Sequence, residues 1–218
     1  MTHSVDKSPA LLRLETFTDA VIAVAITIMV LDLKPPEVTL HARQTPLDFS
    51  FLHHYWPKVL ALALSFLIIA TRWVGLVTYF RQVTRASSAL IWRTLANLFA
   101  ICLVPWAAAF LAEHPTLPQA VAAYGFVGLC LLATTAALER NVERDYPTAV
   151  QDYWSYRRTV VIAGVWALSI PLAFLSIYFS FMIFAAMSLL YLFPRELQGR
   201  VFRPLFDRRP VRSRDDDA

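Results

Sequence analysis

Six apolar segments, each about as long as a membrane-spanning helix, constrain this chain more than any other feature of its sequence. They cover residues 16–33, 57–80, 92–111, 117–138, 158–175 and 177–194. A helix of about 20 apolar residues crosses the hydrocarbon core of a bilayer. The whole chain is 57% hydrophobic, whereas soluble domains contain roughly 45–50% apolar residues. The sequence therefore predicts an all-α integral membrane protein with six transmembrane helices.

The last two segments allow two interpretations. No charged residue lies between Arg158 and Arg195, so this stretch forms either one long helix or two shorter helices that turn between Pro171 and Tyr178. The basic residues favour two helices. With six spans and the amino terminus inside, the inside loops and ends hold Lys7, Arg13, Arg81, Arg85, Arg93, Arg140, Arg144, Arg157, Arg158 and all the arginines from Arg195 onward, and the outside holds only Lys34, Arg43 and Lys58. Cytoplasmic loops are enriched in Lys and Arg, so we predict a multi-pass cell-membrane protein with both termini in the cytoplasm.

The chain divides into two unequal parts. Residues 1–194 are predicted to form one transmembrane domain, and residues 195–218 a cytoplasmic tail. The tail is basic, ends in three aspartates, and contains Pro204 and Pro210, which interrupt a helix. We expect it to be solvated and disordered, and to bind anionic lipids through its arginines.

The first apolar segment has a distinctive helical stripe. At 3.6 residues per turn, seven of its residues fall within an arc of about 100°. They are Arg13, Phe17, Ala20, Val24, Thr27, Ile28 and Leu31. Several copies arranged around an axis would form a basic mouth and a narrow apolar stack with one hydroxyl. The same pattern is also compatible with simple helix packing. Asp19 lies roughly opposite the stripe, so we expect it to brace the subunit or to cap the start of the helix.

The segment also carries a sequence signature. Arg13, Phe17, Thr18 and Asp19 form the pattern Arg-xxx-Phe-Thr-Asp, and Thr27 follows eight positions after the aspartate. This pattern resembles the first helix of the transmembrane protein 175 family of potassium channels, of the prokaryotic type, in which a serine precedes the aspartate. Thr18 keeps that hydroxyl and adds a methyl group, so the hydrogen bond of the family serine can survive. Weaker similarity continues through Ser65, Phe66, Trp73, Asn97, Pro105, Phe193 and Pro194. Residues 76–79 lack the histidine pair of the prokaryotic pattern.

The resemblance implies a homotetramer in which the four first helices line a potassium pore. It places a hydrophobic constriction at Val24, Ile28 and Leu31, and a hydroxyl ring linked to selectivity at Thr27. The source of ion selectivity can also be argued from the residues without the resemblance. A filter of backbone carbonyls needs a glycine-rich loop, and the five glycines of this chain are scattered. We therefore expect side chains to provide selectivity, and the preference for potassium to be weak.

Arg72 and Asn97 are polar residues well inside predicted spans. A charge such as that of Arg72 costs about 2.5–3.5 kcal/mol there on insertion scales unless it is paired or hydrated. Arg72 either forms a buried ion pair with Asp19 or extends its long side chain to the nearer membrane interface. Asn97 is expected to form hydrogen bonds to another helix.

The sequence favours a potassium-permeable, weakly selective cation channel that needs no cofactor. Its expected partners are potassium ions, other copies of the chain and anionic lipids, and no nucleic acid. We do not expect an enzyme, because no Ser, His and acid set, no glycine-rich phosphate loop and no metal-binding pattern is present. The alternative is a non-conducting membrane scaffold or a small secondary transporter. In that case the stripe is an interface, and Asp19 with Arg72 forms a carrier site.

Overall fold

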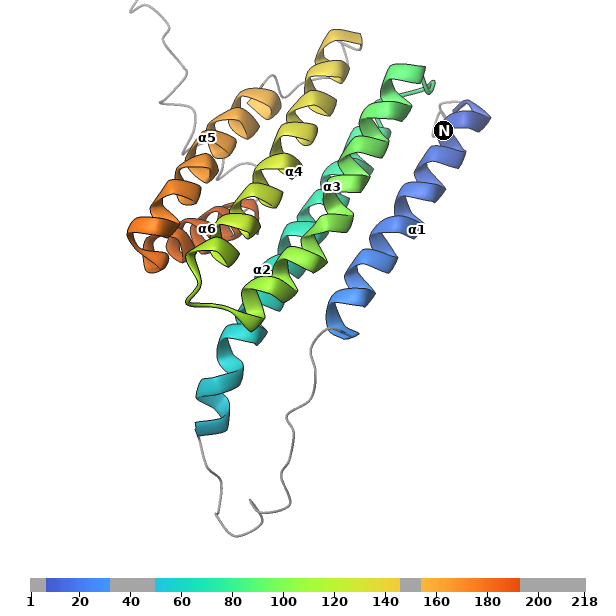
Figure 1. Ribbon diagram of the computed structural model, residues 1–218. Helices are drawn as coiled ribbons and strands as arrows, with labels where there is room; N and C mark the ends of the chain where they lie inside the picture. The colour runs from blue at the N-terminus through green and yellow to red at the C-terminus, as the bar shows by residue number, and fades with distance from the viewer. Residues whose placement is uncertain (1–6, 32–49, 146–153, 193–218) are drawn as a thin grey trace, which may run out of the picture.

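The protein is an all-helical bundle (Figure 1). The computed structural model describes residues 7–31, 50–145 and 154–192. These contain the helices α1 (Pro9–Leu31), α2 (Ser50–Phe80), α3 (Ser88–Glu113), α4 (Pro118–Asp145), α5 (Trp154–Leu175) and α6 (Ile177–Leu192). Each helix overlaps one of the predicted apolar segments over most of its length, which confirms the fold class expected from the sequence. The predicted tail at residues 195–218 lies outside the described residues.

Five of the described helices are long and apolar enough to cross a membrane. They are α1, residues 58–80 of α2, α3, residues 118–141 of α4 and residues 156–175 of α5. Helix α6 is apolar but has only 16 residues, a length of about 24 Å at 1.5 Å per residue. The hydrocarbon core of a bilayer is about 30 Å thick. The chain is therefore a multi-pass membrane protein whose sixth helix is shorter than a full span.

The charge-free stretch near the carboxyl end forms two helices rather than one. Helix α5 ends at Leu175, and α6 begins two residues later. At the turn, the backbone N–H of Ser176 donates to the carbonyl of Leu172 at 2.7 Å. Beyond the turn, the hydroxyl of Ser180 donates to the carbonyl of Ser169 at 2.8 Å. These bonds satisfy polar groups within an apolar environment and hold α6 back against α5.

Helix α1 lies at one edge of the bundle, beside α2 and α3 (Figure 1). It starts at Pro9, about two turns before the predicted apolar segment, because Ser8 caps it. The N–H of Leu11 donates to the hydroxyl of Ser8 at 3.4 Å, and proline is favoured at the first helical position. The N–H of Ser8 donates to the carbonyl of Thr84 at 3.0 Å. The start of α1 is thus joined to the turn between α2 and α3.

Helices α4 and α5 pack closely where α4 has two glycines. The indole of Trp166 lies so near Gly128 that a Cβ atom at that position would be 2.5 Å from the ring. The Nε1–H of Trp166 donates to the carbonyl of Gly125 at 2.8 Å, and the buried Phe184 of α6 lies against the indole. Small residues allow membrane helices to approach in this way.

Helices α3 and α4 are joined by polar side chains. The amide nitrogen of Asn97 donates to the hydroxyls of Thr134 and Thr135 at 3.0 and 3.1 Å. This confirms the expectation that Asn97 forms hydrogen bonds to another helix. Nearer the α2–α3 turn, Arg93 of α3 forms another hydrogen bond between these two helices, to Asn141 of α4.

Candidate functional site

The predicted stripe of α1 is exposed along its whole length in the single chain. Phe17, Val24, Ile28 and Leu31 are between 44% and 78% exposed, and Arg13, Ala20 and Thr27 are exposed as well. The buried residues of α1 are Leu11, Leu14, Thr18, Ile22, Ala25 and Met29. At 3.6 residues per turn these six fall within a separate arc of about 80°. Helix α1 therefore buries one narrow face against its own subunit and leaves the predicted stripe available.

Thr27 is the one hydroxyl-bearing residue of the stripe. Its Oγ1 donates a hydrogen bond to the carbonyl of Val24, one turn earlier, at 2.9 Å. The hydroxyl hydrogen is therefore used within the helix, and the oxygen keeps acceptor capacity on an exposed residue. An oxygen in this state suits contact with a cation.

Asp19 is held by the neighbouring helix. Its carboxylate accepts a hydrogen bond from Nε1 of Trp73 in α2 at 2.9 Å. Ten residues separate Asp19 from the start of α1 at Pro9, so the interpretation of Asp19 as a cap is wrong. The contact with Trp73 instead matches the expectation that Asp19 braces the subunit.

The predicted ion pair between Asp19 and Arg72 is not formed in the described part of the chain, where the one ion pair is between Lys7 and Glu15. The reason is geometric. Neighbouring residues on a helix point about 100° apart, so Trp73 faces α1 while Arg72 does not. The guanidinium of Arg72 lies over Gly75, one turn nearer the end of α2, with atoms 3.5 to 3.6 Å from the Cβ position of that glycine. This direction agrees with the alternative in which the side chain extends toward the membrane interface.

Thr18 lies on the buried face of α1 and is 1% exposed. The sequence predicts that its hydroxyl keeps the hydrogen bond of the family serine. Within the residues that the structure describes, Oγ1 of Thr18 has no hydrogen-bond partner. The hydrogen bond that this hydroxyl can form is therefore not made to any described residue.

Trp73 is the site residue that the sequence assigned least well. It belongs to the weaker similarity beyond the signature, which gives it no partner, and nothing within α1 or α2 alone shows that it meets Asp19. The only signal was the presence of an indole donor and an acid in the same half of two adjacent spans. Asp32, at the far end of the signature segment, lies outside the described residues.

The comparisons with known proteins agree with this geometry. Residues 13–105, which include the signature of α1 and the whole of α2, match the family described as endosomal/lysosomal potassium channel TMEM175. Over these residues the chain is similar to the TMEM175 family. The match ends at Pro105, within α3.

Relatives of the chain come from bacteria. A potassium channel of Streptomyces collinus is 36% identical over 107 residues, which cover 47% of this chain and 48% of the relative. A potassium channel of a Chryseobacterium species is 33% identical over 130 residues, which cover 60% and 63%. The chain thus spans about half to two-thirds of the length of these relatives. They are named as channels, which supports the expectation that this chain is not an enzyme.

The fold also matches a solved structure of the TMEM175 family. The crystal structure of a lysosomal potassium-selective channel TMEM175 homolog from Chamaesiphon minutus has a TM-score of 0.73 and 26% sequence identity to this chain. The match covers 84% of this chain and 97% of the homolog. The similarity therefore extends well beyond the segment that carries the signature.

Proposed function

We propose that four copies of this chain form a potassium-permeable channel whose pore is lined by α1. The observation that carries this proposal is the orientation of α1, because every residue of the predicted stripe is exposed while the opposite side packs against α2 and α3. A lining helix needs such an unpaired face. The names of the relatives as potassium channels support the choice of ion.

The proposed constriction is formed by Val24, Ile28 and Leu31. These residues span about 10 Å along the helix axis, and rings of apolar side chains of this kind close a pore by excluding water. Thr27 lies within this length and would present a ring of hydroxyl oxygens. A single such ring replaces only part of the hydration shell of an ion, so we expect weak selectivity for potassium over sodium.

The proposed orientation places the start of α1 in the cytoplasm. The start of α1, the α2–α3 turn, the end of α4 and the start of α5 lie at the same end of the bundle (Figure 1). The basic residues Arg81, Arg85, Arg140, Arg144 and Arg157 belong to this end. Because basic residues are retained on the cytoplasmic side, we propose that this end, the amino terminus and the carboxyl-terminal tail face the cytoplasm of the cell.

Potassium flux into liposomes that contain the purified protein tests the proposal. Val24→Asn places a polar group in the constriction and should wet it, so the flux should rise by roughly tenfold, the effect of about 1.4 kcal/mol. Val30→Asn is a matched control on the same helix. Val24 and Val30 are 55% and 56% exposed, but Val30 points about 120° away from Val24 and lies outside the stripe. An equal response of the two variants would contradict the pore assignment.

The carrier alternative has lost its structural support. It depends on a site formed by Asp19 and Arg72, and the described residues do not bring these two side chains together. A coupled, saturable uptake of a second solute with the potassium gradient would revive it.

A further inference from the structure

Arg72 is a charged residue for which the described part of the chain supplies no counter-charge. It lies within the membrane-spanning part of α2, eight residues before the end of the helix at Phe80, or about 12 Å along the axis. The described residues place no carboxylate within ion-pair distance of it. The nearest predicted partner, Asp19, is engaged by Trp73. An unpaired charge at this depth is costly, and an anion from outside the described chain would lower that cost.

The guanidinium of Arg72 lies in a notch on α2, the space left by the missing side chain of Gly75. Gly75 has no side chain, and the guanidinium of Arg72 occupies the space above it, at van der Waals distance from its Cβ position. The Nε atom is buried and has no hydrogen-bond partner among the described residues. Arg72 as a whole is only partly buried, and its terminal nitrogens are not among the buried unpaired atoms. They are therefore accessible to a ligand from the surface of the bundle.

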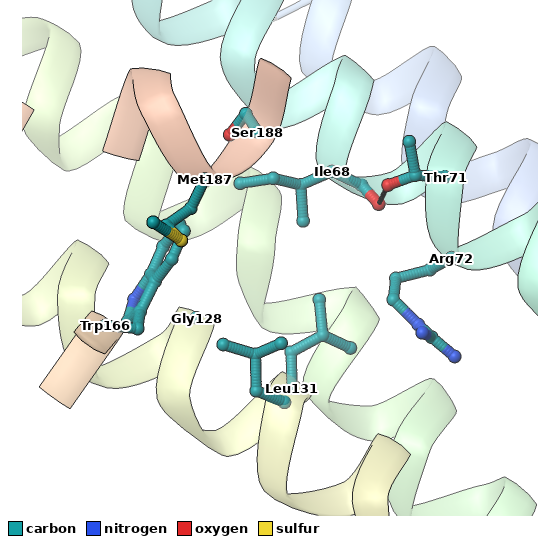
Figure 2. Close-up of a pocket in the computed structure, with 9 residues that line it drawn as sticks. Ile68, Thr71, Arg72, Gly128, Leu131, Trp166, Met187 and Ser188 are labelled. Atoms are coloured by element: carbon teal, nitrogen blue, oxygen red, sulfur yellow. Dashed lines mark hydrogen bonds between the residues drawn. The ribbon is translucent and has the colours of Figure 1, made fainter. Parts of the chain in front are cut away.

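Beside Arg72 is a small pocket between α2, α4, α5 and α6. Its volume is about 30 Å³, and its lining includes Ile68, Leu131, Trp166 and Met187. Figure 2 shows Arg72 on one side of this pocket, with Met187 and Ser188 on the other. Ser188 is 2% exposed, and its hydroxyl has no partner in the described chain. The pocket thus combines an apolar lining with two polar groups that lack hydrogen bonds, and it is large enough for only a small part of a ligand.

We propose that Arg72, in the notch above Gly75, binds the headgroup phosphate of a membrane lipid in the leaflet at the α2–α3 end of the bundle. A guanidinium offers paired N–H donors that match phosphate oxygens, and basic pockets between membrane helices bind lipid headgroups. The apolar lining beside the guanidinium favours a phosphate that carries hydrocarbon over a free phosphate ion. Most of the lipid remains outside the bundle, in agreement with the size of the pocket.

Native mass spectrometry of the purified full-length protein, titrated with phosphatidylglycerol, tests this proposal. Arg72→Gln should weaken binding of the tightest lipid by roughly tenfold, the effect expected for loss of a charged hydrogen bond. Arg81→Gln is the matched control, because it removes the same charge from an exposed residue directly after α2. Its affinity should stay within roughly twofold of that of the unaltered protein.

Gly75→Leu is a second variant that keeps the arginine and fills the notch. Leucine favours a helix more than glycine does, so the fold should persist while lipid affinity falls. Equal lipid binding by the unaltered protein and by Arg72→Gln would overturn the proposal. Displacement of the lipid by an equal concentration of inorganic phosphate would overturn the lipid assignment. A change in subunit number in Arg72→Gln without a change in lipid binding would show that another copy supplies the anion, and this also overturns it. None of these readouts depends on conduction.

Discussion

Helices α1 and α4 have the same mean hydropathy of 1.9 over their most apolar windows, but 28% of the α1 window is buried within the chain and 50% of the α4 window. The two helices are equally suited to a bilayer and differ in what they contact. In a membrane, apolarity shows that a helix spans and does not show which face packs, because lipid tails are as apolar as a protein core. The packing of α4 is instead specified by its glycines and threonines, and that of α1 by a narrow buried face and a few polar contacts.

The contrast predicts that substitutions in α4 damage the fold and substitutions on the α1 stripe damage only flux. Gly128→Leu should have the largest effect on folding, because the new side chain would overlap the indole of Trp166 and displace its hydrogen bond to Gly125. Overpacking of this kind costs about 1–3 kcal/mol, and denaturant unfolding in mixed micelles measures it. Gly164→Leu is the control, since nothing lies within 4 Å of the Cβ position of Gly164. A similar loss in both variants would show that helix packing does not depend on the close contact between Gly128 and Trp166.

A pair of isoleucines tests the contrast within α1 itself. Ile22 is 2% exposed and Ile28 is 44% exposed. Ile22→Ala should lower the free energy of unfolding by about 2 kcal/mol, because it leaves a cavity against the other helices. Ile28→Ala should lower it by about 0.5 kcal/mol or less but should change potassium flux, because Ile28 belongs to the proposed constriction. The reverse ranking in the unfolding measurement would mean that α1 is turned the other way in the membrane.

The hydrogen bond between Trp73 and Asp19 joins α1 to α2, and its loss should have the smallest of the three effects on folding. Trp73→Phe removes the donor and should cost about 1 kcal/mol, because Asp19 is exposed and can find another partner. The control is Trp92→Phe, which alters an indole that is 73% exposed. If the two variants unfold at the same denaturant concentration, the bond does not hold α1 in place.

The sequence predicts what depends on one helix and fails where two helices must be placed together. The apolar segments gave six helices, and the phase of Arg13, Phe17 and Leu31 gave the exposed face of α1. The sequence left two alternatives for Arg72, an ion pair with Asp19 or extension to the interface, because the relative rotation of α1 and α2 is set by packing along both helices. The residues near Pro171 do not by themselves choose between one helix and two, a choice that the positions of the basic residues made instead, since the turn is stabilised by Ser180 and Ser169, which meet only after the chain folds back.

In the proposed channel, the hydrogen bond from Ser8 to Thr84 restricts how the pore can open. It ties the start of α1 to the turn between α2 and α3. While that tether holds, neighbouring copies of α1 can separate at this end only if each α2–α3 turn moves outward with them, or if α1 bends beyond its anchored start. Residues 81–87 are then as well placed to govern opening as the proposed constriction itself.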